Sequence, residues 1–272
     1  MIFNFEGYDQ LLPLVTNSLI VGAMLAVVGG LVGVFVINRD MSFAVHGISE
    51  LSFAGASITL LIGGNVVFGS VVGSLVAAIV IGVMGAKAKE RNSITAVLMP
   101  FGLGLGILAL SLYEGRASNK FGLLTGQIVA VDDPQLISIS IIAAIVVVTL
   151  LIVWRPLTFA SIDSEVAAAR GVATRTLSVV FMVILGLAVA ASIQVVGALL
   201  VLSLLVTPAA AAVRVSRSPF VIPMLSVAFA MISVIGGILL ALGSSLPISP
   251  YVTSISFLIY LICRAISWVR SR

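Results

Sequence analysis

The chain has 272 residues, of which 61% are hydrophobic and only 9% are charged, and its mean hydropathy is +1.29. Soluble domains carry about 25% charged residues, so this composition excludes an ordinary water-soluble protein and predicts one integral membrane domain over residues 1–272. The formal net charge is +4, and we attribute it to membrane topology and expect no nucleic-acid partner.

Nine apolar stretches follow one another along the chain and predict an all-α, polytopic helical bundle in the lipid bilayer. About 20 apolar residues in a helix cross the hydrocarbon core of a bilayer. The sixth and seventh stretches form one run, which we divide at Gln194 because roughly 40 residues would be about twice the span needed. Eight spans remain possible if one short segment is re-entrant. The stretches cover residues 11–37, 42–63, 66–86, 93–113, 134–154, 176–194, 195–213, 219–243 and 250–268.

The basic residues fall almost entirely in alternate connections between these stretches. If the connection Asn38–Asp40 faces the cytoplasm, twelve of the fourteen Lys and Arg residues lie on that side, and only Arg116 and Lys120 lie outside. The positive-inside rule then predicts an external amino terminus and a cytoplasmic carboxyl terminus in a multi-pass protein of the plasma (inner) membrane. The twelve are Arg39, Lys87, Lys89, Arg91, Arg155, Arg170, Arg175, Arg214, Arg217, Arg264, Arg270 and Arg272.

The second stretch contains the only histidine of the chain and the only acidic residue deep within an apolar stretch. His46 and Glu50 are four residues apart, so a helix places them on one face, about 5 to 6 Å apart. An imidazole and a carboxylate at this spacing can bind one divalent cation. Because a carboxylate at the bilayer centre costs about 3 kcal/mol even on lenient scales, we expect it to face a polar cavity, a partner or a passing ion. His46 and Glu50 are the candidate metal ligands.

A purely structural role for this pair is the alternative. The two side chains would then hydrogen-bond each other or neighbouring backbone and hold helices together. Two ligands alone bind a divalent ion weakly, but a transport pathway requires that the ion leave readily, and water or other helices can complete its coordination.

Small residues and the single cysteine have simpler interpretations. Gly29 with Gly33, Gly69 with Gly73, and Gly102 with Gly106 have the spacing that lets helix backbones approach closely in lipid, so we interpret them as packing residues. Cys263 is the sole cysteine, which excludes an internal disulfide and a cysteine metal cluster.

The long cytoplasmic connection, about residues 155–175, predicts a short surface helix. Asp163 can cap its amino end, Glu165 complements the helix dipole and Gly171 can terminate it. Such a helix is suited to docking a partner. A solvated surface helix without a partner is the alternative.

These motifs together resemble the permease subunits of ATP-binding cassette importers for manganese, zinc and iron(II). The resemblance covers most of the chain. It is carried by Arg39-Asp40-Met41-Ser42, His46-Gly47-Ile48-Ser49-Glu50, Gly55, Asp163-Ser164-Glu165 with Ala168 and Gly171, and Val196-Gly197-Ala198-Leu199-Leu200 leading to Thr207-Pro208-Ala209-Ala210.

This chain departs from the family pattern at two positions of these motifs. The family's second-span motif usually reads aspartate and, four residues later, histidine, both implicated in passing the metal. Here His46 takes the aspartate position and Glu50 the histidine position, so the two ligand types are exchanged. The cytoplasmic motif generally reads aspartate-proline-glutamate, and Ser164 replaces the proline.

The resemblance implies a type II importer-like permease that works by alternating access and holds no permanent cofactor. Its cargo would be Mn²⁺, Zn²⁺ or Fe²⁺, with manganese favoured for the hard carboxylate ligand. The implied partners are a second copy of the chain, with the metal path between the two copies, two cytoplasmic ATP-binding cassette ATPase subunits and an extracytoplasmic metal-binding protein. Asp163, Glu165, Ala168 and Gly171 would form the ATPase-coupling helix.

Other classes of protein are less compatible with the sequence. The chain has no glycine-rich loop ending in Gly-Lys-Ser or Gly-Lys-Thr, so we expect a transport subunit and not an ATP-hydrolysing enzyme. An intramembrane metalloenzyme needs about three protein ligands and a base, which one histidine cannot supply. An ion-coupled secondary transporter, with His46 and Glu50 as a proton or cation relay, remains the competing hypothesis.

Overall fold

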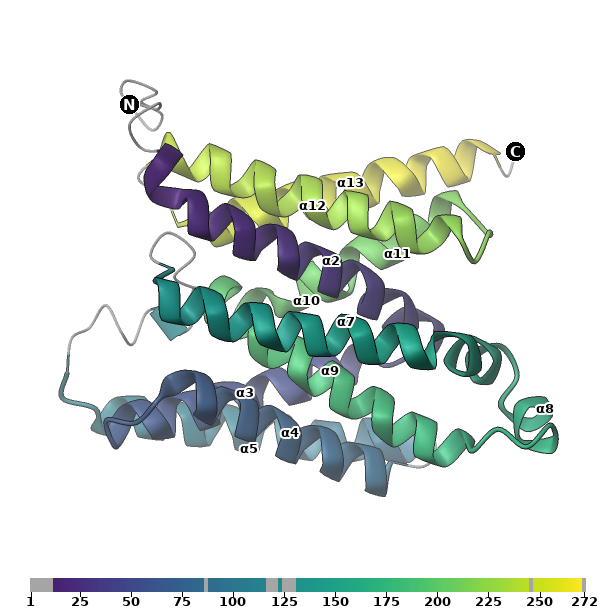
Figure 1. Cartoon of the computed structure of the whole chain (residues 1–272), viewed down its shortest axis with the longest axis horizontal. Helices are drawn as coiled ribbons and strands as arrows, with labels where there is room; N and C mark the ends of the chain where they lie inside the picture. Colours follow the sequence, from purple (N-terminus) through teal and green to yellow (C-terminus); the bar gives the residue numbers. More distant parts are fainter. Residues whose placement is uncertain (1–11, 86–87, 116–121, 124–130, 245–246, 271–272) are drawn as a thin grey trace.

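The computed structural model describes residues 12–85, 88–115, 122–123, 131–244 and 247–270. Within these ranges the regular structure is helical, and eight helices are long and apolar enough to cross a membrane. Figure 1 shows them side by side along one axis, which confirms the all-α bundle. They are α2 (Thr16–Asn38), α3 (Ser42–Leu61), α4 (Val66–Met84), α5 (Ala88–Leu112), α7 (Asp133–Ile162), α9 (Thr174–Val196), α12 (Val221–Leu242) and α13 (Ile248–Arg270).

The seventh predicted stretch is not one helix. The chain breaks at Gly197, three residues beyond the predicted division, where a φ of +86° requires a conformation that glycine adopts easily. Three short helices follow: η3 (Ala198–Leu200), α10 (Val201–Leu205) and α11 (Thr207–Val215). Pro208 lies in the first turn of α11, where its missing N–H leaves no helical hydrogen bond unmade.

The broken segment nevertheless runs along the whole length of α13. Ser249, Ser256 and Arg270 of α13 donate hydrogen bonds to the carbonyls of Val196, Ser203 and Val215, at 3.3, 3.1 and 3.4 Å respectively. These bonds lie at the start, middle and end of α13, so the segment passes from one end of the bundle to the other. The described residues therefore make nine passes, and the start of α2 and the end of α13 lie at opposite ends (Figure 1).

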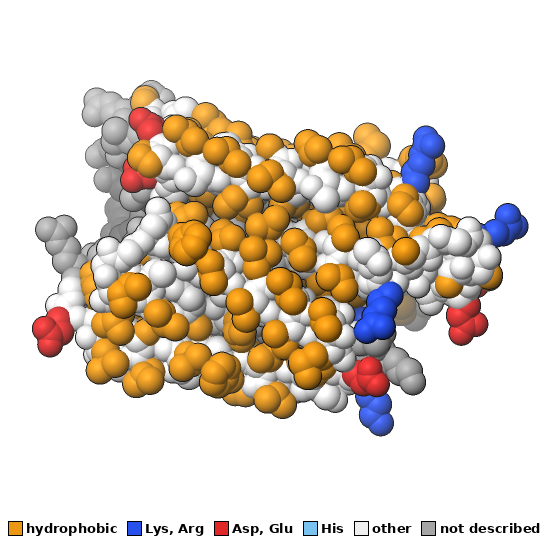
Figure 2. Space-filling view, turned by 60° about the horizontal axis from the view of Figure 1, so that its bottom comes forward, with side chains coloured by type: hydrophobic (Ala, Val, Ile, Leu, Met, Phe, Trp, Pro, Cys, Tyr) orange, Lys and Arg blue, Asp and Glu red, His pale blue; other side chains and the backbone are white. Residues whose placement is uncertain are grey.

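Three of the long helices are mostly buried by the other five. α2, α3 and α9 form the interior, and α3 packs between α4 and α5 and against α9. α3 has the lowest mean hydropathy of the eight spans, 1.2. A comparatively polar helix in the interior keeps its polar groups away from lipid. Figure 2 shows the result on one face, a surface of hydrophobic side chains between two charged ends.

Glycines permit the close approach of the inner helices, as predicted. A Cβ atom at Gly33 would overlap the backbone carbonyl of Leu205, and one at Gly73 would overlap that of Leu51. The other four predicted glycines also have a neighbouring atom at or below 3.0 Å from such a Cβ. Backbone atoms cannot rotate away, so the crossings at Gly33 and Gly73 require glycine.

The basic side chains lie mainly at one end of the bundle. In Figure 2 the Lys and Arg side chains in view gather at the end that carries α8 (Ser164–Ala169), whereas Asp and Glu are seen at both ends. Four of the residues used to predict topology, Lys87, Arg116, Lys120 and Arg272, lie outside the described residues.

The connection before α8 is shorter than predicted. α7 continues to Ile162, eight residues beyond the predicted stretch, so Arg155 belongs to this helix and the connection begins at Asp163. Pro156 is accommodated within α7. The end of the predicted apolar stretch is therefore not the end of the helix.

Candidate metal site and coupling segment

His46 and Glu50 lie one helical turn apart on α3, as predicted. His46 Nε2 and Glu50 Oε1 are 3.8 Å apart, and the two side chains are 31% and 5% exposed. This distance is too long for a hydrogen bond between them. Two ligand atoms each about 2.1 Å from one ion, at roughly a right angle, would be about 3.0 Å apart, so a small rotation brings the pair to that distance. His46 Nδ1 is buried and has no hydrogen-bond partner among the described residues.

Helix α5 packs closely against the backbone of α3 at this level. A Cβ atom at Gly102 of α5 would lie 2.9 Å from the carbonyl carbon of Glu50, and Gly47 of α3 abuts Thr95 of α5. Ser49 Oγ donates a 2.7 Å hydrogen bond to the carbonyl of His46. The pair thus lies on a helix whose backbone packs closely against α5.

The amino end of α3 is anchored by two arginines. Arg91, which is 8% exposed, donates through Nη2 to the carbonyls of Arg39 and Asp40, each at 3.2 Å. Arg39 donates to Ser178 Oγ of α9 at 2.6 Å, and its guanidinium lies 5.8 Å from the ring centre of Phe181. Burial, and secondly the charge of Arg91, lower the pKa of Arg39 below its usual value.

The role of Arg91 was missed from the sequence, where it contributed only to topology. The available signal was its position just before an apolar run, which places its guanidinium at a helix end. Only the fold shows that this end lies beside the turn between α2 and α3.

The pair would supply two protein ligands to a metal ion. No group of three or more His, Cys, Asp or Glu side chains that could hold a metal ion occurs within the described part of the chain. An ion at this point would complete its coordination with water, with uncharged oxygens or with groups from another subunit.

The predicted coupling residues come together at one end of the bundle. Asp163 Oδ1 accepts hydrogen bonds from the backbone N–H groups of Glu165 and Val166, both at 3.0 Å, and so caps α8. Gly171 has a φ of +85° and ends the turn.

The side chains of α8 are exposed except at one residue, as expected for a surface helix that contacts the bundle through a single side chain. Ala167 is fully buried and attaches the helix to the bundle, whereas Asp163, Glu165, Ala168 and Gly171 are all exposed. Figure 1 shows α8 projecting at the end of the bundle where α7 ends and α9 begins.

The fold defines a multi-pass integral membrane protein. Residues 12–267 match the model of the ABC 3 transport family, and the chain belongs to this family. The resemblance found in the sequence is thereby confirmed.

Individual relatives agree with this assignment. The chain is 27% identical over 264 residues to the manganese import system permease protein ScaB of Streptococcus parasanguinis, covering 96% of this chain and 94% of that protein. It is 27% identical over 225 residues to the high-affinity zinc uptake system membrane protein ZnuB of Haemophilus influenzae, covering 82% and 86%. Among solved structures it is similar to PsaBC from Streptococcus pneumoniae in complex with Fab, with a TM-score of 0.81, 26% identity and coverage of 91% and 89%.

Proposed function

We propose that this chain is the permease subunit of an ATP-driven importer of divalent transition metal ions in the plasma membrane. The observation that carries the proposal is the His46–Glu50 pair, an imidazole and a carboxylate 3.8 Å apart inside a membrane-spanning helix. Ionisable groups are rare at such positions and mark ion pathways. The pair binds the ion briefly as it passes.

Manganese is the favoured cargo, and zinc and iron(II) are alternatives. An imidazole and a carboxylate without a thiolate suit all three ions, and affinity order alone would favour zinc. The relatives are named for manganese import and for zinc uptake, which supports this range.

The proposed transporter contains two copies of the chain, two cytoplasmic ATPase subunits and an external metal-binding protein. His46 is 31% exposed in the single chain, and a second copy facing it would enclose the metal path between the two. α8 is capped, exposed and attached through Ala167, and in this proposal it transmits ATPase closure to the bundle. Alternating access follows as the two copies tilt.

The proposed orientation places α8 in the cytoplasm. Lys and Arg side chains gather at the end of the bundle that carries α8 (Figure 2), and cytoplasmic ends of membrane proteins are rich in these residues. The amino terminus is then external and the carboxyl terminus cytoplasmic.

Loss of either ligand tests the proposal directly. His46→Ala and Glu50→Ala should each reduce metal uptake by at least about tenfold, since each removes one of two protein ligands. Uptake of radioactive manganese by cells grown under chelation measures this effect. Membrane abundance of the permease and its copurification with the ATPase should be unchanged.

The double variant His46→Asp with Glu50→His is the matched control. It restores the ligand order of the related permeases and retains one carboxylate and one imidazole, so uptake should recover relative to either alanine variant. Normal uptake by both alanine variants would remove His46 and Glu50 from the metal path.

A further inference from the structure

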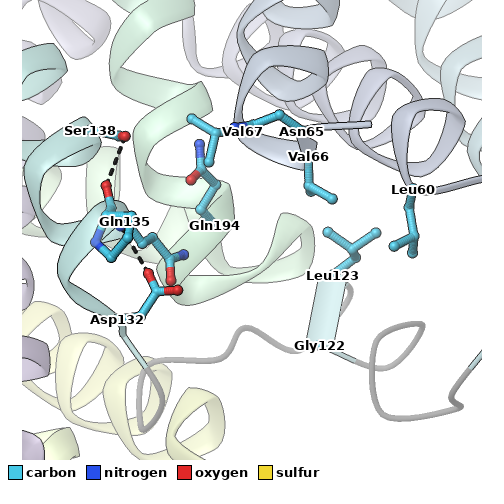
Figure 3. A pocket seen from close by; sticks show the side chains of 11 residues that line it. Leu60, Asn65, Val66, Val67, Gly122, Leu123, Asp132, Gln135, Ser138 and Gln194 are labelled. Atoms are coloured by element: carbon cyan, nitrogen blue, oxygen red, sulfur yellow. Dashed lines mark hydrogen bonds between the residues drawn. The ribbon is translucent and has the colours of Figure 1, made fainter. Parts of the chain in front are cut away.

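A polar cavity lies at the end of the bundle opposite α8. Its volume is about 360 Å³, and it is lined by the ends of α3, α4, α7 and α9 together with Gly122 and Leu123. Figure 3 shows Asp132, Gln135 and Ser138 near the start of α7 on one side, and Gln194 of α9 beside them. Among the described residues that line it there is no Lys or Arg.

Gln194 brings an unsatisfied acceptor to this cavity. The residue is 7% exposed, and its Nε2 donates to the carbonyl of Ala190 at 3.4 Å. Gln194 Oε1 is buried and has no hydrogen-bond partner among the described residues. Buried polar atoms are nearly always paired, so an acceptor left open beside a polar cavity is available to water or to a ligand that offers positive charge or a donor.

Asp132 places a negative charge in the same cavity. Its Oδ1 accepts the N–H of Gln135 at 2.9 Å and so caps α7. The amino end of a helix contributes about half a positive charge, so the full charge of the carboxylate leaves the balance negative. Asp133, the next residue, instead accepts a 2.9 Å hydrogen bond from Asn17 of α2 and does not line the cavity.

Buried hydrogen bonds connect the floor of the cavity to α3. The carbonyl of Ala190 that pairs with Gln194 also accepts a 3.4 Å hydrogen bond from Ser70 Oγ. The hydroxyls of Ser70 and Ser52 lie 2.8 Å apart, and both residues are fully buried. Ser52 follows Glu50 by two residues on α3, so the cavity is attached to the helix that carries the inner pair.

We infer that this cavity is an outer binding site for a hydrated divalent cation, with the Asp132 carboxylate and Gln194 Oε1 as its oxygen contacts. The inference rests on the proposed function and adds a site on the external side, before the ion reaches His46 and Glu50. Six waters occupy about 180 Å³, so the cavity accommodates the ion with its hydration shell. Oxygen contacts of this kind bind weakly and select little between manganese and magnesium.

Titration with Mn²⁺ alone tests the site. The experiment uses the full-length chain in lipid nanodiscs with the substitution Glu50→Ala, which removes the carboxylate of the inner pair. The electron paramagnetic resonance signal of free Mn²⁺ reports how much Mn²⁺ the protein binds. One ion per chain should remain bound, with a Kd on the order of millimolar. Adding Asp132→Asn, which keeps the cap acceptor, or Gln194→Leu should raise this Kd by at least about tenfold.

The adjacent carboxylate provides the matched control. Asp133→Asn removes the same charge one residue away, and the Kd should stay within about twofold of the parent. Gln194→Glu keeps the size of the side chain and adds a charge, so it should lower the Kd, and it covers the case in which Gln194→Leu does not fold.

Three results would overturn the inference: no Mn²⁺ bound to the Glu50→Ala protein, the same Kd after Asp132→Asn and both Gln194 substitutions, or an equal loss with Asp133→Asn. Uptake by the His46 and Glu50 single variants separates this inference from the proposed function. Mn²⁺ binding that depends on Asp132, together with normal uptake by those variants, would retain the outer site and reject the inner pathway.

Discussion

Glu50 carries a carboxylate inside a membrane-spanning helix, and its neighbours explain how the bilayer tolerates it. The side chain is 5% exposed because α3 lies in the interior of the bundle, between α4 and α5. A carboxylate facing lipid would cost about 3 kcal/mol or more. Burial within protein, with His46 Nε2 3.8 Å from Glu50 Oε1, replaces the lipid contact.

Gly73 should be intolerant of even one added methyl group. A Cβ atom there would overlap the carbonyl oxygen of Leu51, next to Glu50, and lie 3.2 Å from the Cα of Ser52. Since these are backbone atoms, α4 must move away from α3, and we expect Gly73→Ala to destabilise the protein by about 1 to 3 kcal/mol. Thermal unfolding of the purified protein in detergent measures the effect as a lowered Tm.

Gly104→Ala is the control for this prediction. Gly104 is also within a long helix, but nothing lies within 4 Å of a Cβ built on it. Alanine is a better helix former than glycine by about 1 kcal/mol, so Tm should stay the same or rise slightly. Equal losses of Tm in both variants would contradict the packing explanation.

The seventh pass and α8 are elements that are not straight membrane-spanning helices. The chain departs from a regular helix at Gly197, and Pro208 lies in the first turn of the helix α11 that follows, whereas the prediction divided the run at Gln194 from its length alone. Whether the run between them crosses the bilayer or returns was decided by its hydrogen bonds along α13. A helix broken by glycine within a bundle is a feature that membrane transporters use, because neighbouring helices satisfy the freed backbone groups.

α8 should be required for assembly with an ATPase. Asp163→Lys combined with Glu165→Lys removes the cap and reverses both charges at the exposed amino end of α8. We expect the ATPase to be lost from the purified complex, measured by copurification, with permease abundance in the membrane unchanged.

Glu114→Lys serves as the control for this variant, because Glu114 is exposed at the opposite end of the bundle. It should leave copurification intact. If the unmodified chain copurifies with no ATPase and its uptake instead follows a proton or sodium gradient, the secondary-transporter hypothesis would replace the proposed function.

For the whole molecule, orientation in the membrane decides which site meets the metal first. With α8 in the cytoplasm, the cavity at Gln194 opens to the outside and the His46–Glu50 pair lies nearer the cytoplasmic end of α3. The two sites then follow one another along the direction of import.

Cysteine labelling tests this orientation. Cys263 is the only cysteine, so Cys263→Ala provides a background without thiols. Arg170→Cys, beside α8, should react with a membrane-impermeant maleimide only after cells are permeabilised. Gly64→Cys, in the turn between α3 and α4, should react in intact cells. The reverse labelling pattern would show the opposite orientation in the membrane, with the cavity at Gln194 on the cytoplasmic side.

The sequence by itself determined the membrane class, the approximate positions of the spans, the spacing of His46 and Glu50 on one helix and the cap of α8. Each of these depends on local composition or on spacing within one helix, which a helical period of 3.6 residues converts directly into geometry. The resemblance carried by these same motifs added the family. Whether His46 and Glu50 bind metal stays a prediction.

Only the tertiary structure decided which helices lie inside, how the seventh pass is broken and what surrounds Gln194 and Arg91. Hydropathy does not rank the spans by burial, because the two spans of lowest hydropathy, α3 and α13, are respectively among the most buried and the least buried. The cavity joins α7 to α9 across about 60 residues of chain, and Arg91 contacts a turn 51 residues before it. Such contacts arise from how helices pack against one another, which local residue patterns do not specify.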